Sequence, residues 1–155
     1  SRGKKSLAGC GGVMRGADGR WIGGFSRKLG VCSALNAELW AVLSGLELAG
    51  SRQLDNIVLE SDSTSVVQKL KQLQIEEEAG SRMLKAIRAA MGKFSRIIIS
   101  HVYREGNGCA DVLAGLSFAQ VEEYVIFETP PLLVRSVMYK DYMGSSYPRY
   151  ALIQK

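Results

Sequence analysis

The N-terminal part of the chain alternates short apolar segments with glycines around a single turn signal. Ala17-Asp18-Gly19 separates two β-competent segments, 11–16 and 20–25. The Asp-Gly pair favours a tight hairpin turn, because both residue types tolerate the positive φ angles that such turns require. Glycines at 9, 11, 12, 23 and 24 indicate that other backbone approaches these strands closely. The pattern predicts a β-hairpin.

After the hairpin, the spacing of apolar residues alternates between helical and strand periods. Ser33 and Asn107 are candidate helix caps, and Gly50 is a candidate helix stop. The predicted helices run over about 33–49, 63–73, 81–91 and 107–116. A buried strand is predicted over 57–59, and the strongest strand signal covers 96–103. This order of elements predicts an α/β layer fold with a mixed central β-sheet.

The composition is that of an ordinary globular domain. The chain has 155 residues, of which 46 % are hydrophobic and 23 % charged, and no apolar run approaches the roughly 20 residues of a membrane-spanning helix. The residue pattern of the chain changes after Gln120, where a β-competent segment at 122–128 precedes Pro130-Pro131. We therefore expect a domain over 1–119, a C-terminal appendage over 120–155 and no membrane partner.

Charge and cysteine content narrow the choice of partner and compartment. The net charge is +5, and Asp18 is the only acidic residue before Glu38, a bias that is compatible with nucleic-acid binding and also with a merely solvated basic face. Cys10, Cys32 and Cys109 are odd in number and widely spaced. This favours an intracellular, reducing compartment, either nucleus or cytoplasm, over a disulfide framework.

Three carboxylates fall at the ends of predicted elements. Glu38 lies early in the first helix, Asp62 follows the strand at 57–59, and Asp111 lies in the first turn of the last helix. Functional groups collect beyond strand ends in open α/β sheets, and converging carboxylates are stabilised by Mg²⁺ or Mn²⁺. Each acid also has a purely structural explanation, as a solvated helix residue, a helix cap or a partner of a helix dipole.

Four segments, taken together and in order, resemble ribonuclease H type 1. They resemble most closely the reverse-transcriptase-associated form found in plant retrotransposon-derived genes. The similarity covers about 9–118, and its motifs are Cys10-Gly11-Gly12-Val13, Ala37-Glu38-Leu39-Trp40-Ala41, Glu60-Ser61-Asp62-Ser63 and His101-Val102-Tyr103-Arg104-Glu105-Gly106-Asn107 followed by Ala110-Asp111.

The resemblance implies a ribonuclease H-like fold, in which a five-stranded mixed central β-sheet is flanked by helices on both faces. It also implies a function and a set of site residues. The family is an endonuclease that hydrolyses the RNA strand of RNA–DNA hybrids, with two Mg²⁺ or Mn²⁺ ions and no small-molecule cofactor. Its catalytic, metal-binding acids match Glu38, Asp62 and Asp111. A monomer is expected. Candidate nucleic-acid contacts, which would read 2′-hydroxyls and phosphates, are Gly11, Gly12, Ser33, Asn36, Ser63, Thr64, Arg104 and Asn107.

The sequence departs from the family pattern at its start. The family carries a first catalytic aspartate on a first strand, which lies between the hairpin and the strand before Asp62, and neither is found here. Either the natural protein is longer or another segment fills the gap, with 124–127 as a less favoured candidate. Glu76-Glu77-Glu78 stands where some members carry a basic protrusion, and this predicts weak hybrid binding. The truncated chain could therefore be inactive.

Two other functions compete with the nuclease hypothesis. One is a non-catalytic nucleic-acid or protein interaction module on the same fold, favoured by the missing aspartate. The other is a nucleotide-binding domain, which fails because Gly9-Cys10-Gly11-Gly12 precedes a hairpin and not a helix. The aromatic residues Trp21, Trp40, Phe94 and Tyr103 are expected in the core or on sheet faces, and His101 is expected to have a structural role or a minor contact.

Overall fold

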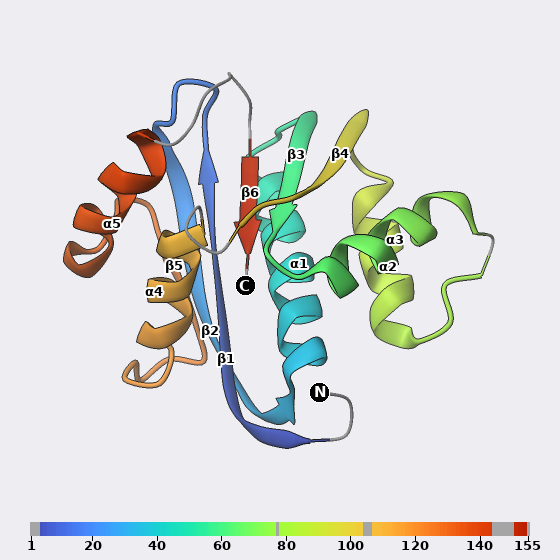
Figure 1. The fold of residues 1–155 in the computed structure, drawn as a ribbon, viewed down its shortest axis with the longest axis horizontal. Coiled ribbons are helices and arrows are strands. Elements are labelled where there is room, and N and C mark those ends of the chain that lie inside the picture. Colours follow the sequence, from blue (N-terminus) through green and yellow to red (C-terminus); the bar gives the residue numbers. More distant parts are fainter. Residues whose placement is uncertain (1–3, 77, 104–106, 144–150, 155) are drawn as a thin grey trace.

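The predicted order of elements is confirmed, and the C-terminal part adds three more. The computed structural model describes residues 4–76, 78–103, 107–143 and 151–154, with the backbone alone for 138–143 and 151–154. In chain order its elements are β1 (Lys5–Arg15), β2 (Trp21–Ser33), α1 (Ala34–Ser51), β3 (Asn56–Ser61), α2 (Thr64–Ile75), α3 (Arg82–Met91), β4 (Arg96–His101), α4 (Gly108–Leu116), β5 (Tyr124–Phe127), α5 (Leu132–Met143) and β6 (Ala151–Gln154) (Figure 1).

The turn between β1 and β2 forms as the Asp-Gly pair predicts. Gly19 has a φ of 84°, which places it in the left-handed region that glycine adopts without steric cost. The backbone N–H of Gly16 donates to the Arg20 carbonyl at 2.8 Å. The Asp18 carboxylate accepts from the Arg20 N–H at 3.0 Å and closes the turn.

Serine side chains cap the first three helices. The Oγ atoms of Ser33, Ser63 and Ser81 accept hydrogen bonds from backbone N–H groups three residues later, at 3.2, 3.2 and 3.1 Å. Each bond satisfies one of the N–H groups that a helix start leaves without an intrahelical partner. Each cap fixes the residue at which its helix begins. It therefore also fixes the position of the residues on either side of that helix start.

One predicted capping interaction and one predicted helix stop are wrong. Asn107 occupies the N-cap position of α4, but its side chain makes no capping hydrogen bond and is fully buried. Gly50 does not stop α1, which continues to Ser51. The left-handed residue is Gln53, with a φ of 60°. The N–H groups of Arg52 and Gln53 still donate hydrogen bonds to α1 carbonyls. The chain therefore leaves the helix after Gly50, and it turns at Gln53.

The sheet is mixed and has six strands in the order β4-β3-β6-β1-β2-β5. β1 and β2 form the long antiparallel hairpin, and β3 and β4 are parallel. β6 lies between the two pairs, antiparallel to β1 over Gly12–Arg15 and parallel to β3 over Val58–Ser61. Figure 1 shows this short C-terminal strand at the centre of the sheet.

The prediction that 124–127 could fill a central gap is therefore corrected. This segment does form a strand, β5, but it pairs antiparallel with the outer side of β2 over Gly24–Arg27. The last described residues, 151–154, take the position between the hairpin and β3 instead. A central strand satisfies backbone groups on both of its neighbours, so the C-terminal segment contributes to the same sheet as the rest of the chain.

Helices cover both faces of the sheet, and glycines set how closely α4 approaches. α1 packs on β1, β2 and β6, whereas α4 packs on β1 and β2 from the other side, with α5 against it. A Cβ atom at Gly11 would lie 2.5 Å from the Ala114 backbone nitrogen, and one at Gly9 would clash with the Ser117 side chain. The closely packed helix thus confirms the expectation from the glycine-rich segment.

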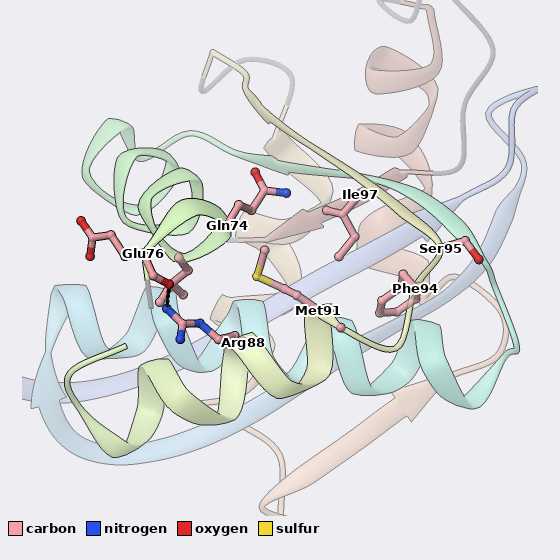
Figure 2. A pocket seen from close by; sticks show the side chains of 9 residues that line it. Gln74, Glu76, Arg88, Met91, Phe94, Ser95 and Ile97 are labelled. Atoms are coloured by element: carbon pink, nitrogen blue, oxygen red, sulfur yellow. Dashed lines mark hydrogen bonds between the residues drawn. The ribbon is translucent and has the colours of Figure 1, made fainter. Parts of the chain in front are cut away.

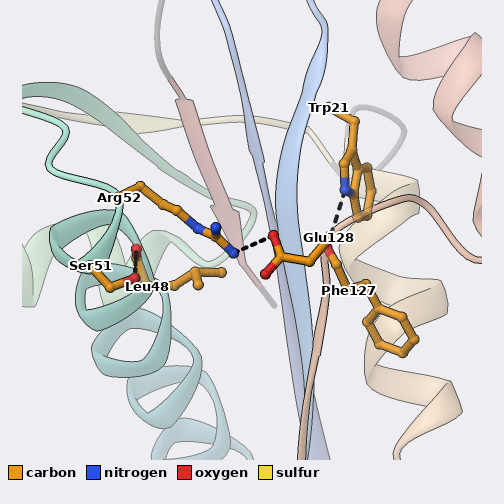
Figure 3. Close-up of polar contacts among 6 residues, drawn as sticks. All are labelled: Trp21, Leu48, Ser51, Arg52, Phe127 and Glu128. Atoms are coloured by element: carbon orange, nitrogen blue, oxygen red, sulfur yellow. Dashed lines mark hydrogen bonds and ion pairs between the residues drawn. The ribbon is translucent and has the colours of Figure 1, made fainter.

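A hydrogen bond holds the segment around β5 against the hairpin, and one ion pair holds it against the end of α1. The indole N–H of Trp21 donates to the Phe127 carbonyl at 3.3 Å, and Arg52 pairs with Glu128 at 2.6 Å (Figure 3). On the sheet, the Arg27 guanidinium lies 3.9 Å above the Tyr124 ring centroid. In the part of the chain that the structure describes, no helix is long and apolar enough to cross a membrane.

We expect Gly11→Ala to destabilise the fold by about 1–3 kcal/mol, because its methyl group would force α4 away from β1. Gly115→Ala is the matched control on α4, where a Cβ meets no atom within 4 Å. This control should be neutral or stabilise by up to about 1 kcal/mol, because alanine favours helix over glycine. Urea unfolding of both variants measures the difference. Equal stability would contradict the close approach.

We expect Ile153→Pro to destabilise the chain by at least about 1–3 kcal/mol, because proline removes an N–H from the ladder of a central strand and leaves a buried partner unsatisfied. Amide hydrogen exchange should then accelerate at Gly12–Arg15 and Val58–Ser61, the residues that β6 pairs with. Unchanged exchange at both strands would show that β6 does not occupy this position.

Candidate nucleic-acid site

Asp62 lies where β3 passes into α2. Ser61 ends the strand, and its Oγ accepts from the Ser63 N–H at 3.1 Å, while Ser63 in turn caps α2. The Val102 N–H donates to the Ser61 carbonyl at 3.0 Å and extends the β3–β4 ladder by one residue beyond β4. These bonds fix the half-buried Asp62 at the carboxyl end of a parallel strand, where α/β folds place functional groups.

Asp111 comes from α4 and lies near the same end of the sheet as Asp62. Cys109 and Ala110 pack with Val13 of β1, and the backbone around Leu113 and Ala114 lies against Gly11. Asp111 therefore stands over the part of β1 from Gly11 to Val13.

The strand register connects this level of β1 to Asp62. Gly12 of β1 is aligned with Gln154 of β6, and Gln154 is aligned with Ser61 of β3. Since Asp62 follows Ser61 directly, Asp62 and Asp111 belong to the same end of β3 and β6.

Glu38 comes from the opposite face of the sheet. It lies in α1, five residues after the Ser33 cap, and is half-buried. α1 packs on β1, β2 and β6. The three acids are thus carried by α1, α4 and the end of β3, three elements that all adjoin the centre of the sheet.

The described residues contain no group of three His, Cys, Asp or Glu side chains that could hold a metal ion. A joint metal site of Glu38, Asp62 and Asp111 therefore stays a prediction. Carboxylate oxygens are nevertheless the donors that Mg²⁺ prefers, and Mg²⁺ is commonly bound by one or two carboxylates together with substrate phosphates. The donor chemistry fits such a shared site, whereas the residues that the structure describes include no preformed three-ligand group.

The candidate nucleic-acid contacts differ in how accessible they are. Asn36 and Thr64 are exposed, and Ser63 is partly exposed. The remaining described candidates are all buried, namely Gly11, Gly12, Ser33 and Asn107. Arg104 lies outside the described residues. Because Ser33 and Ser63 use their hydroxyls as caps and Gly11 lies under α4, the exposed Asn36 and Thr64 are the candidates best placed to reach a ligand.

The prediction that Tyr103 is a core or sheet-face residue is wrong, because its side chain is 78 % exposed. Phe94 is buried, as predicted, and Trp21 and Trp40 are half-buried. His101 is exposed too, and its ring meets the Tyr103 ring edge-on at a centroid distance of 5.6 Å. The sequence predicts a strand that runs to Tyr103, but β4 ends at His101, so Tyr103 lies beyond the strand.

A hollow of about 460 Å³ lies away from the acids, between α2, α3 and the start of β4 (Figure 2). It is lined by Gln74, Arg88, Met91 and Phe94 among others, and Arg88 donates to the Glu76 carbonyl there. Since Ser95 and Ile97 border it and β3 runs parallel to β4, the hollow is at the opposite end of these strands from Asp62.

Two groups with raised pKa values, Cys10 and Tyr124, are not among the three candidate acids. Burial raises the pKa of the Cys10 thiol to about 12, with the nearby Arg27 opposing the rise. Burial likewise raises the pKa of Tyr124, again opposed by Arg27. Cys10, Cys32 and Cys109 form no disulfide. Because their pKa values are raised, Cys10 and Tyr124 are neutral members of the packing on the α1 side and not candidate nucleophiles.

Comparisons with known proteins agree with this architecture. A family model described as "Reverse transcriptase-like" matches residues 1–117. The Arabidopsis thaliana protein named "Putative ribonuclease H protein At1g65750" is 38 % identical over 149 residues, which are 96 % of this chain and 24 % of that protein. The chain therefore spans about a quarter of the length of this relative.

Two solved structures share the fold. RNase H1 from the halophilic archaeon Halobacterium salinarum NRC-1 has a TM-score of 0.64 and 29 % identity, over 77 % of this chain and 91 % of that one. The N-terminal RNase H domain of rv2228c from Mycobacterium tuberculosis, solved as a fusion with maltose binding protein, has a TM-score of 0.66 and 26 % identity, over 77 % and 87 %. With the family model matching most of the sequence, this chain belongs to the reverse transcriptase-like family of ribonuclease H-like domains.

Proposed function

We propose that this chain is the nuclease domain of a metal-dependent endonuclease that hydrolyses the RNA strand of RNA–DNA hybrids. The observation that carries the proposal is the placement of Asp62 and Asp111 at one level of the sheet, on the strand end and the helix that adjoin β6 and β1. The ribonuclease H names of the similar proteins support the substrate class.

In this proposal Glu38, Asp62 and Asp111 hold Mg²⁺ or Mn²⁺ together with the phosphate of the bound strand. Bound divalent ions would polarise the phosphate and would lower the pKa of a water molecule bound to them toward neutrality. The protein's own contribution is to position the acids. The Ser61 and Ser63 hydrogen bonds fix the backbone on either side of Asp62, and the packing of Ala110 on Val13 fixes the first turn of α4.

Recognition of the hybrid requires contacts to ribose and to phosphate. Only the RNA strand offers 2′-hydroxyl groups, and an exposed amide such as that of Asn36 can both donate to and accept from them. Thr64, exposed at the start of α2, can bind a phosphate of the other strand. The net charge of +5 supplies a sequence-independent attraction that weakens as salt rises.

A non-catalytic nucleic-acid module remains the second candidate, and one observation favours it. The strand register places the β6 segment Ala151–Gln154 between β1 and β3, and this segment contains no acidic residue. This favours a domain that binds nucleic acid without cleaving it. Cleavage and binding are therefore measured separately below.

The full chain is expected to cut the labelled RNA strand of a hybrid when Mg²⁺ or Mn²⁺ is present and to stop when EDTA is added. Asp62→Asn should slow cleavage by at least roughly 100-fold, because it removes a ligand worth several kcal/mol of transition-state stabilisation. Asp18→Asn, a charge-matched change in the hairpin turn, should cleave like wild type. Gel electrophoresis of the RNA products gives the rates.

Hybrid binding by the same preparation separates the two candidates. Binding without metal-dependent cutting would contradict the nuclease and support the non-catalytic module. Cutting that persists undiminished in Asp62→Asn would show that Asp62 is not in the active site, or that the cutting comes from a contaminating nuclease.

A further inference from the structure

Two aromatic side chains stand exposed at the end of β4. Tyr103 is 78 % exposed, which is the highest value among the aromatic residues whose burial the structure describes. The rings of His101 and Tyr103 meet at 5.6 Å with an interplanar angle of 82°. Edge-to-face contacts of this kind are favourable between aromatic rings, so His101 restricts the orientation of the Tyr103 ring while leaving most of it open to solvent.

The strand register places these rings beside Asp62. Ser61 of β3 is aligned with His101 of β4, and the Val102 N–H bonds to the Ser61 carbonyl at 3.0 Å. Asp62 is the next residue after Ser61, and Tyr103 is the next residue after Val102. The backbone hydrogen bond thus joins the chain segment that carries the proposed catalytic acid to the segment that carries both rings.

We propose that Tyr103, oriented by His101, packs against a sugar of the nucleic-acid strand that binds at the Asp62 end of the sheet. This inference rests on the proposed function, because it takes the hybrid as the ligand, and it assigns to Tyr103 a positioning role. The ring holds one nucleotide beside Asp62 and so fixes which phosphate is aligned with the acids.

Of the three parts of a nucleotide in a hybrid, the sugar is the one that the Tyr103 ring can contact most favourably. The faces of bases inside a duplex are stacked on one another, so a surface ring cannot insert between them without unstacking. A neutral phenol gains little from a phosphate compared with Lys or Arg. The sugar ring, however, presents an apolar face, and an exposed aromatic ring can pack against it.

The test is hybrid binding by the full chain in EDTA, which prevents cleavage, measured by fluorescence anisotropy with a labelled short hybrid. Tyr103→Ala should weaken binding roughly five- to tenfold, the lower end of the range for aromatic contacts with nucleotides. Tyr103→Phe should bind like wild type, because it keeps the ring. Phe118→Ala is the matched control, since Phe118 is 55 % exposed but lies beyond the C-terminal end of α4.

A salt titration distinguishes ring packing from an electrostatic effect. The slope of log Kd against log salt should be the same for wild type and Tyr103→Ala, because no phosphate contact is lost. The thermal midpoint should also stay unchanged, since the truncated side chain is exposed.

The outcomes separate this inference from the proposed function. Equal binding by wild type and Tyr103→Ala, or an equal loss in Tyr103→Phe, would overturn the role of the ring while leaving the hybrid as ligand. Equal losses in Tyr103→Ala and Phe118→Ala would also overturn it, because the effect would not depend on the place of the ring. A wild-type chain that binds no hybrid at any salt concentration, in EDTA or in Mg²⁺ with a hybrid whose RNA strand cannot be cleaved, would overturn the proposed function itself.

Discussion

The close packing of α4 on β1 is the constraint on which the candidate site depends. A Cβ atom at Gly11 would lie 2.5 Å from the Ala114 backbone nitrogen, so only glycine permits the observed separation of helix and strand. This contact sets how far along β1 the first turn of α4 begins, and hence where Asp111 stands relative to the end of β3. The glycine-rich segment therefore positions a catalytic candidate that lies about a hundred residues later in the chain, through packing alone.

The second constraint is the central strand. Between the hairpin and β3 the sheet accepts a strand that runs antiparallel to β1 and parallel to β3, and β6 meets both requirements with only four residues. Its register also decides which residue adjoins Ser61, and that residue is Gln154. The same strand thus supports the sheet, and its four described residues include no acidic one, which is why catalysis and binding must be tested independently for this chain.

Local signals predicted most of the domain core. The Asp18-Gly19 turn and the helix starts at Ser33, Ser63 and Ser81 follow from short-range chemistry, in which a side chain or a flexible backbone satisfies its own neighbours. The failures involve long-range packing. The burial of Asn107, the continuation of α1 past Gly50 and the central position of 151–154 depend on segments far apart in sequence. The acids were identified from their places at element ends, whereas the exposure of Tyr103 required knowing that β4 ends at His101.

The central claim is that divalent cations and a hybrid meet at the end of β3, between Asp62 and the first turn of α4. Paramagnetic broadening by Mn²⁺ tests it most directly, in NMR spectra recorded with a hybrid whose RNA strand cannot be cleaved. The account predicts that the amide signals of Asp62, Ser63 and Asp111 broaden first, and that those of Met91 and Phe94 beside the distant hollow do not. Broadening centred on the hollow, or spread evenly over the surface, would contradict it.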